Sequence, residues 1–404
     1  MKRVVFALLI VASLLLAPTA AFAQDELPIA CGTLSEEDCD FLKESRDATM
    51  AVASTASRVE MAISLTNVPQ LPEELALDLV VDGQFQLDPE LAARGMELQL
   101  KMADDPTAAA EEMMAYALDI YANLMMNMDL DLSLSDDLTG LLSAQAGLPL
   151  PSEWSFPVRM SDGFVYFNLD DVGEAVGDSG LAGWLGMDMA GLMEKTFAQM
   201  EEDPAFKSDP MMMGAIAGQM QSQMALSEAA VQYTDVERLE DVEVDGVDAA
   251  QFFYTFDLAG FIASPEFGEM LKGQLEMQMS MQEQMGGEAP PMSDADMQMA
   301  LDMLPMVGPM LLSGVKIGSV STIGLEDKLV RTTETDVEWE LGTVITMAGA
   351  MMQGQATRVP RGADAPVFTM HISGENSAFD EEFEVEVPED AQIIPLESMM
   401  QETM

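Results

Sequence analysis

The stretch EWSFPVRMSDGFVYFNLDD, residues 153–171, holds two short runs on either side of Asp162-Gly163. The first run places an apolar side chain at every second residue: Trp154, Phe156, Val158 and Met160. Such alternation is typical of a half-buried antiparallel strand. Asp-Gly is favoured where a two-residue hairpin turn requires positive φ. The stretch therefore predicts a β-hairpin with one apolar face and one polar face.

The same alternation recurs along the chain, and turn signals separate several of the runs. Alternating runs occupy residues 75–82, 129–135, 252–258, 337–341 and 382–387. Further turns are predicted at Asp82-Gly83, Asp245-Gly246 and Glu326-Asp327-Lys328. Counting every candidate gives about 11 to 13 strands, more than one flat sheet holds without curling. We therefore expect a large curved antiparallel sheet or partial barrel.

Methionine-rich segments alternate with these strands and have the composition of helices. They contain many Ala, Met, Leu, Gln and Glu residues and lie near 36–58, 107–127, 180–202, 209–232, 261–285 and 294–312. In the segment that begins at Ser264, apolar residues recur at helical spacing: Phe267, Met270, Leu271, Leu275 and Met281. Because the helices fall between hairpins and do not alternate singly with strands, the predicted class is α+β.

The first residues predict export. Lys2 and Arg3 precede an apolar run, and Ala21-Phe22-Ala23 has the form of a signal-peptidase site, so residues 1–23 are expected to be a signal peptide. No later segment has the roughly 20 apolar residues of a membrane span. Cys31 is not expected to be acylated, because several polar residues separate it from the apolar run. We expect a periplasmic or extracellular protein.

The two cysteines, Cys31 and Cys39, are expected to form a disulfide in an exported chain. Ser35 and Asp38 have the form of a capping box, which predicts that a helix begins at Ser35. A bridge there would fix the mature N-terminus to the first turns of that helix.

Composition limits the possible partners. Hydrophobic residues make up 49% of the 404, enough for a large core, and residues 24–404 are expected to form a single domain with helical insertions near 180–232 and 261–312. The 71 acidic residues outnumber 17 basic ones, for a net charge of -54. Nucleic acid and anionic lipid surfaces would repel such a chain. The acidity is also typical of proteins from a saline habitat, where salt screens self-repulsion.

The sequence offers no catalytic constellation and predicts no cofactor. The single histidine, His371, lies in VFTMHIS on the face opposite Phe368, Met370 and Ile372, which indicates a surface residue. The acidic run 129–137 lacks the glycine turn of a calcium loop and alternates with leucines, so it is interpreted as a solvated sheet face. We expect a protein that is not an enzyme.

The methionines allow three interpretations. Met277, Met279 and Met281 would form a thioether site for Cu(I), but residues two apart on a helix point away from each other. The 38 methionines of the chain would alternatively fill the core of a structural cell-surface module. They would otherwise line a cavity that accepts variable apolar ligands.

A resemblance favours the last interpretation. The export signal, the hairpins SDGFVYFNL and VEVDGVDAAQFFYTFDL, and the final FEVEVPEDA resemble the LolA and LppX lipoprotein-carrier-like superfamily. The resemblance implies an unclosed antiparallel half-barrel covered by helices, with an apolar cavity for a lipid or lipoprotein acyl chain. The delivery partner is not identified. Candidate cavity residues, for which the inward-facing parity is open, are Trp154, Phe156, Phe252, Phe253, Met270, Leu271, Met281 and Met310.

Overall fold

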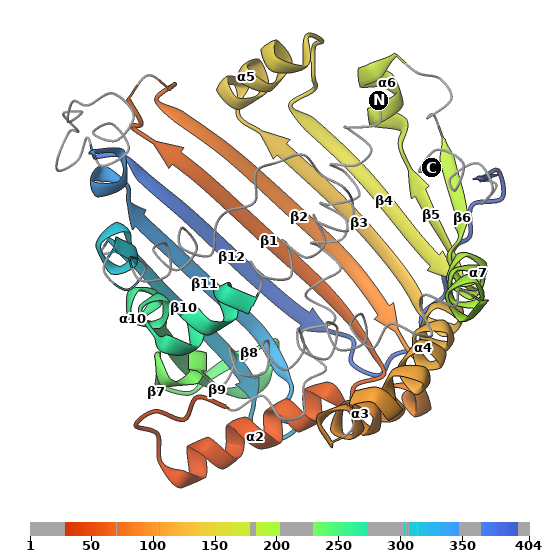
Figure 1. Cartoon of the computed structure of the whole chain (residues 1–404), viewed down its shortest axis with the longest axis horizontal. Helices are drawn as coiled ribbons and strands as arrows, with labels where there is room; N and C mark the ends of the chain where they lie inside the picture. The colour runs from red at the N-terminus through yellow and green to blue at the C-terminus, as the bar shows by residue number, and fades with distance from the viewer. Residues whose placement is uncertain are drawn as a thin grey trace.

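The computed structural model describes residues 29–69, 71–104, 106–177, 183–202, 229–273, 303, 305, 307–312, 314–346 and 365–394 (Figure 1). Within these residues, 13 strands form one sheet in the order β13-β6-β5-β4-β3-β2-β1-β12-β11-β10-β9-β7, with β8 beside β9. Adjacent strands are antiparallel except for the short β13–β6 pair, which is parallel. The sheet does not close on itself. The predicted α+β class with a large unclosed sheet is confirmed.

Most strands that are adjacent in the sheet are also consecutive in the sequence. Their bounds are β1 Ser54–Thr66, β2 Glu74–Gln86, β3 Met125–Leu134, β4 Glu153–Ser161, β5 Phe164–Asn168, β6 Trp184–Asp188, β7 Thr234–Arg238, β8 Val242–Val244, β9 Val247–Phe256, β10 Val315–Gly324, β11 Val330–Glu340, β12 Val367–Ser377 and β13 Gln392–Ile393.

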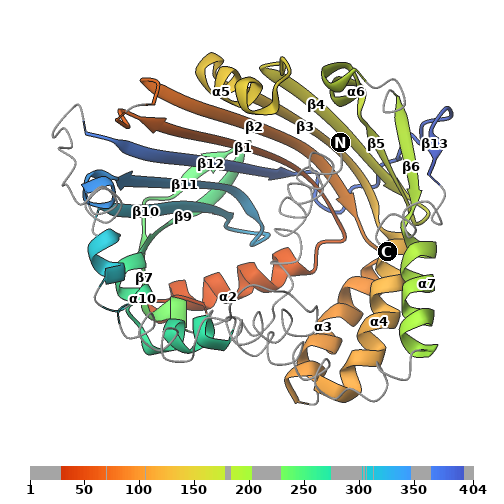
Figure 2. The ribbon, with the colours of Figure 1, turned by 45° about the horizontal axis from the view of Figure 1, so that its top comes forward.

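Most of the helices lie on the concave side of the curved sheet (Figure 2). Those on the concave side are α2 Glu36–Met50, α3 Pro89–Asp104, α4 Pro106–Asn123, α7 Met189–Glu202 and α10 Leu258–Ile262. Two more, α5 Asp136–Ala146 and α6 Asp170–Val176, lie at the opposite ends of the strands from α3 and α4. In the described part of the chain, no helix combines the length and hydropathy needed to cross a membrane.

Three predicted helices extend too far. The segment 36–58 is helical only to Met50, and β1 begins at Ser54. The segment 107–127 is helical only to Asn123, and β3 begins at Met125. The segment 180–202 contains β6 before α7 begins at Met189. The β-branched Thr55 lies near the end of the first segment and Val59 lies just beyond it, and both belong to β1, so the strand pattern overrides the helical composition of its neighbours. The signal peptide, most of the 209–232 segment and much of the 261–312 segment lie outside the described residues.

The turn predictions are confirmed at three positions and wrong at one. Asp162 and Gly163 have φ of 52° and 79°, Asp245 and Gly246 have 53° and 79°, and Lys328 has 62°. Gly83 instead lies inside β2, opposite Met128 of β3. A Cβ on Gly83 would lie 2.7 Å from the ring of Phe85. Glycine at this position therefore makes room for an aromatic ring on the strand surface, and no turn forms.

The two faces of the sheet differ in chemistry. We name the face that carries Leu79, Leu130, Val158 and Phe252 the inner face, because its residues pack against α2 and α4. The outer face carries exposed acidic residues: Glu60, Asp78, Asp82, Asp131, Glu334, Asp336 and Glu338. Ser35 begins α2 by accepting a hydrogen bond from the Asp38 amide at 3.1 Å, so the predicted cap is confirmed.

The predicted last strand, near residues 382–387, is wrong. These residues follow β12 as an extended segment without a backbone ladder. Two outer-face side chains hold it: Gln86 accepts from the Phe383 amide at 3.4 Å, and Asn127 donates to the Glu384 carbonyl at 3.2 Å. Phe383 and Val385 of this segment are half-buried, whereas Val387 is 42% exposed, so the alternation in FEVEVPEDA does not form a strand with a buried face.

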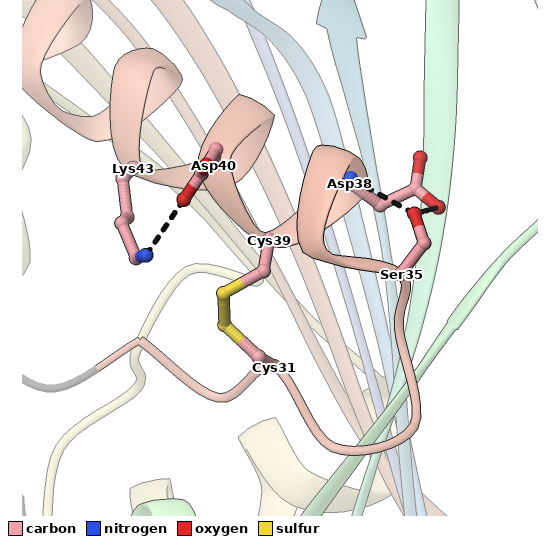
Figure 3. Close-up of a disulfide and its surroundings, with 6 residues drawn as sticks. All are labelled: Cys31, Ser35, Asp38, Cys39, Asp40 and Lys43. Carbon is pink, nitrogen blue, oxygen red and sulfur yellow. Dashed lines mark hydrogen bonds and ion pairs between the residues drawn. A yellow bond between two sulfur atoms is a disulfide. The ribbon is translucent and has the colours of Figure 1, made fainter.

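Segments near both ends of the described chain cover the two edges of the sheet. At one edge β13 pairs with β6, and the Ile394 amide donates to the Gly186 carbonyl at 2.9 Å. At the other edge Gly32 lies against β7, where a Cβ on Gly32 would lie 3.2 Å from the Val236 nitrogen. The predicted Cys31–Cys39 disulfide is confirmed and ties the Gly32 loop to α2 (Figure 3).

Candidate ligand-binding face

The inner face contains two packed clusters with a less covered region between them. The first cluster spans β2 to β5, where Leu79, Met128 and Val158 are buried and Tyr121 of α4 packs against them. The second spans β7, β9 and β10, where Phe252 is buried beneath α2. Strands β1, β12 and β11 run between the two clusters. Their apolar inner-face side chains are half-buried: Val59, Met61, Ile63, Leu65, Phe368, Met370, Ile372, Val337 and Trp339.

Strand register joins these side chains into cross-strand rows. Each row runs from β2 through β1 and β12 to β11: Leu79, Met61, Ile372 and Thr335; then Leu77, Ile63, Met370 and Val337; then Leu75, Leu65, Phe368 and Trp339. Directly opposed Cβ atoms lie about 4.5–5.5 Å apart, so neighbouring side chains touch. The result is a continuous apolar surface whose side chains are half-buried, apart from Leu79, which is buried in the first cluster.

Aromatic rings border this surface on both sides. Trp154 and Phe156 of β4 stack with ring centroids 6.0 Å apart and planes inclined by 12°. Both lie on the inner face, because Leu132 and Leu130 oppose them on β3. At the other border, the Trp339 indole nitrogen donates to the Leu311 carbonyl at 3.3 Å. Because the indole N–H has this acceptor, the Trp339 ring is able to make apolar contacts without an unpaired polar group.

The remaining predicted site residues fall in different places. Phe252 is on the inner face but is 0% exposed, whereas Phe253 points to the outer face and lies against Gly318. The parity left open by the sequence is thereby determined. Met270 and Leu271 are half-buried in a helix over 265–273, and Met310 is 46% exposed. Met281 lies outside the described residues, as do Met277 and Met279 of the copper hypothesis.

Sequence reasoning missed the residues at the centre of this face. The run VEMAISL, residues 59–65, places an apolar side chain at every second position, but it directly follows the predicted helix 36–58 and was not predicted as a strand. The run VFTMHIS was used only to place His371, which is indeed exposed on the outer face, with its Nδ1 2.8 Å from an Asp336 carboxylate oxygen. Its alternate residues Phe368, Met370 and Ile372 were the signal for the inner face.

Charge is kept away from the central part of the inner face. Inner-face positions 55–65, 368–376, 333–339 and 315–321 carry no charged side chain.

Arg238 lies on the inner face at the β7 edge, where it donates to Asp38 of α2 and, at 2.9 Å, to Asp241. The Arg238 guanidinium, helped by the Ser35 hydroxyl, holds the pKa of Asp38 below its ordinary value. Burial raises the pKa of Tyr254, also on the inner face, to about 12.

An open cavity of about 410 Å³ beside α2 has a different character. Its lining is charged and includes three carboxylates of α2 and two cations: Glu37, Asp40, Phe41, Glu44, Arg238, Leu325 and Lys328. Burying an apolar chain among such groups would cost the hydration of the charges. In the described residues, no group of three or more His, Cys, Asp or Glu side chains is arranged to hold a metal ion.

Comparisons with known proteins give matches at the level of structure only. No protein family model and no curated protein sequence matches the chain. The chain is similar to LprF from Mycobacterium bovis, with 10% identity over 88% of this chain and 98% of that one and a TM-score of 0.29. It is also similar to LppX from Mycobacterium tuberculosis, with 9% identity, 87% and 100% coverage and a TM-score of 0.26.

A third match is a DUF1329 family protein from Desulfovibrio piger, with 8% identity, 85% and 94% coverage and a TM-score of 0.18. At these identities the likeness concerns the fold, so what the face binds is argued from its own side chains.

Proposed function

We propose that this protein is an exported, non-enzymatic carrier that holds an apolar ligand, a lipid or a lipoprotein acyl chain, against its inner face. One observation carries the proposal: the three cross-strand rows of β2, β1, β12 and β11 form a mostly half-buried apolar surface on the concave side of the sheet. The expected signal peptide and the Cys31–Cys39 bridge support export. Residues 24–404 act in this proposal as a single domain.

The size of the surface suits acyl chains. Two residues of a strand rise about 7 Å and adjacent strands lie about 4.8 Å apart, so the rows cover an area of about 14 by 14 Å. Each methylene group buried against such a surface contributes about 0.8 kcal/mol. The methionines among the lining residues, Met61 and Met370, adapt their unbranched side chains to chains of different shape.

The first test is native mass spectrometry of protein purified from its exported compartment, followed by organic extraction. A lipid-sized mass that co-purifies, and that the neutral dye Nile red displaces, is the expected result. A ligand-free protein that also fails to bind Nile red at micromolar concentrations would contradict the proposal and leave the methionines as core filling.

A matched pair of variants on β1 locates the site. Ile63 points to the inner face and its neighbour Ala62 is exposed on the outer face. We expect Ile63→Asn to weaken Nile red binding at least about tenfold, because the ligand must then desolvate an amide. Ala62→Asn should leave binding unchanged, and thermal denaturation should show that both variants fold. Equal effects of the two substitutions would place the ligand elsewhere.

A further inference from the structure

A hydrogen-bonded pair of hydroxyl groups interrupts the apolar inner face. Ser319 of β10 and Thr335 of β11 oppose each other in the strand register, and their side-chain oxygens lie 2.8 Å apart. The next inner-face pair along these strands, Ser321 and Thr333, also carries hydroxyl groups. Four hydroxyl-bearing side chains, all half-buried, thus lie together between the apolar rows and α2.

The pair is continuous with the proposed ligand surface. Thr335 opposes Ile372 of β12 and ends the row that contains Met61 and Leu79. On its other side Ser319 opposes Tyr254 of β9, whose burial raises the pKa of its phenol to about 12. A ligand whose chain lies along the rows of β1 and β12 would therefore reach Thr335 and Ser319 without leaving the inner face.

The pair has one hydroxyl proton left to donate to a ligand. Two hydroxyl groups carry two protons, and the bond between Ser319 and Thr335 uses one of them. The second proton and the remaining lone pairs are left for water or for a ligand that replaces it. An ester carbonyl or a hydroxyl group at the polar end of a lipid would be a suitable partner.

The surrounding charge disfavours an anionic head group. On the strands that carry the pair and on β12 and β1, no charged residue lies at the described inner-face positions 315–321, 333–339, 368–376 and 55–65. Arg238, at the β7 edge, is engaged by Asp38 and Asp241. The same strands carry Glu334, Asp336 and Glu338 on the outer face, and the whole chain has a net charge of -54. A phosphate or carboxylate near Ser319 would therefore meet a negative field, and the described inner-face positions of these strands offer it no cation.

We propose that Ser319 and Thr335 determine ligand specificity by binding an uncharged ester or hydroxyl head group, and that the ligand is an electrically neutral acylated lipid. This inference rests on the proposed function. The hydroxyl pair acts as the polar end of the site, and the three apolar rows hold the chain.

The test compares three ligands with chains of equal length: 1-monooleoylglycerol, which is neutral, 1-oleoyl-lysophosphatidylglycerol, which is anionic, and 1-octadecene, which has no polar group. Displacement of Nile red from the full mature chain measures each affinity. The double variant Ser319→Ala with Thr335→Val should weaken monooleoylglycerol binding about tenfold and leave octadecene within about twofold. Thr335→Ser, which keeps the hydroxyl group, should retain the affinity.

The outer face supplies a matched control. Ser64 of β1 and Thr369 of β12 form the same kind of cross-strand pair, also with oxygens 2.8 Å apart, on the opposite side of the sheet. Ser64→Ala with Thr369→Val removes an equivalent pair and should change no ligand affinity. Thermal denaturation of both double variants separates lost binding from lost folding.

Each remaining outcome overturns the inference in a different way. If the inner double variant loses both neutral ligands equally, or neither, the pair is only a structural contact. If lysophosphatidylglycerol binds as tightly as monooleoylglycerol at low salt, the exclusion of anions is wrong. If none of the three displaces Nile red from the unmodified protein, the proposed function fails together with the inference.

Discussion

Phe41 of α2 packs against Phe252 of β9 with ring centroids 5.9 Å apart and ring planes inclined by 31°. Phe252 was a candidate ligand residue, but it is 0% exposed beneath α2 and is therefore a core residue. Lys328 lies over the other ring of the pair, with its nitrogen 3.9 Å from the Phe41 centroid. The second inner-face cluster is therefore filled by α2, and the half-buried apolar surface begins beside it.

We predict that Phe252→Ala lowers the free energy of unfolding by about 3–5 kcal/mol, as expected for truncating a fully buried phenylalanine. Its neighbour Phe253 is half-buried on the outer face and provides the control. Phe253→Ala should cost clearly less, about 1–2 kcal/mol, because part of that side chain already contacts water and its loss leaves no enclosed cavity. Urea denaturation measures both, and equal costs would show that α2 does not cover Phe252 in solution.

The sheet was predictable because strand alternation is local. Trp154, Phe156, Val158 and Met160 identify an apolar face without knowledge of the partner strand, and Asp162-Gly163 identifies its turn. Gly83 shows the limit of such signals. An Asp-Gly dipeptide favours a turn only where the chain is free to reverse, and here the ladders to β1 and β3 on either side keep Gly83 extended.

The candidate site was less predictable because it depends on what covers each residue. Alternation placed Phe252 and Phe253 on opposite faces, but only the contact with Phe41 reveals that Phe252 is buried. The start of β1 was missed because the helical composition of 36–58 extended a helix prediction over Thr55 and Arg58, which belong to the strand. Whether an apolar strand face is filled or free is decided by helices distant in sequence, and composition does not contain that information.

We predict that replacing Cys31 and Cys39 with serine lowers the free energy of unfolding by about 2.5 kcal/mol, the entropy released by opening a loop of this size. The two cysteines are separated by 8 positions. Thermal denaturation of the wild type with and without a dithiol reductant should reproduce the difference, and the reductant should not affect the serine variant. An intact mass that does not rise by two hydrogens on reduction would contradict the bridge.

Gly32 should be intolerant of a side chain because of its close approach to β7. Its φ of 46° is in the left-handed region, and a Cβ would lie 3.2 Å from the Val236 nitrogen. Gly246 shares the positive φ, at 79°, but a Cβ there would meet nothing within 4 Å. We expect Gly246→Ala to cost about 1 kcal/mol from conformation alone, and Gly32→Ala to cost about 1 kcal/mol more. Equal shifts in the urea midpoint would mean that the edge of β7 is not covered by Gly32.

The contact between Asp38 and Arg238 predicts a pH-dependent stability. The hydrogen bonds from Arg238 and Ser35 lower the pKa of Asp38 below its ordinary value of 3.8, so the unfolded chain binds this proton more readily than the folded chain. Stability from this group is therefore present above about pH 5 and is lost as the pH falls through the lowered pKa. Asp38→Asn should cost about 1 kcal/mol at pH 7, and the difference from the wild type should shrink below pH 3.

Asp40, two residues along α2, is the control for this prediction. Its carboxylate pairs with Lys43 at 2.8 Å, but its side chain is 58% exposed, compared with 17% for Asp38. Solvent screens an exposed pair, so Asp40→Asn should change the free energy of unfolding by less than about 0.5 kcal/mol at any pH. Urea denaturation of the two variants between pH 2.5 and 7 would reject the role of Arg238 if the two pH profiles coincide.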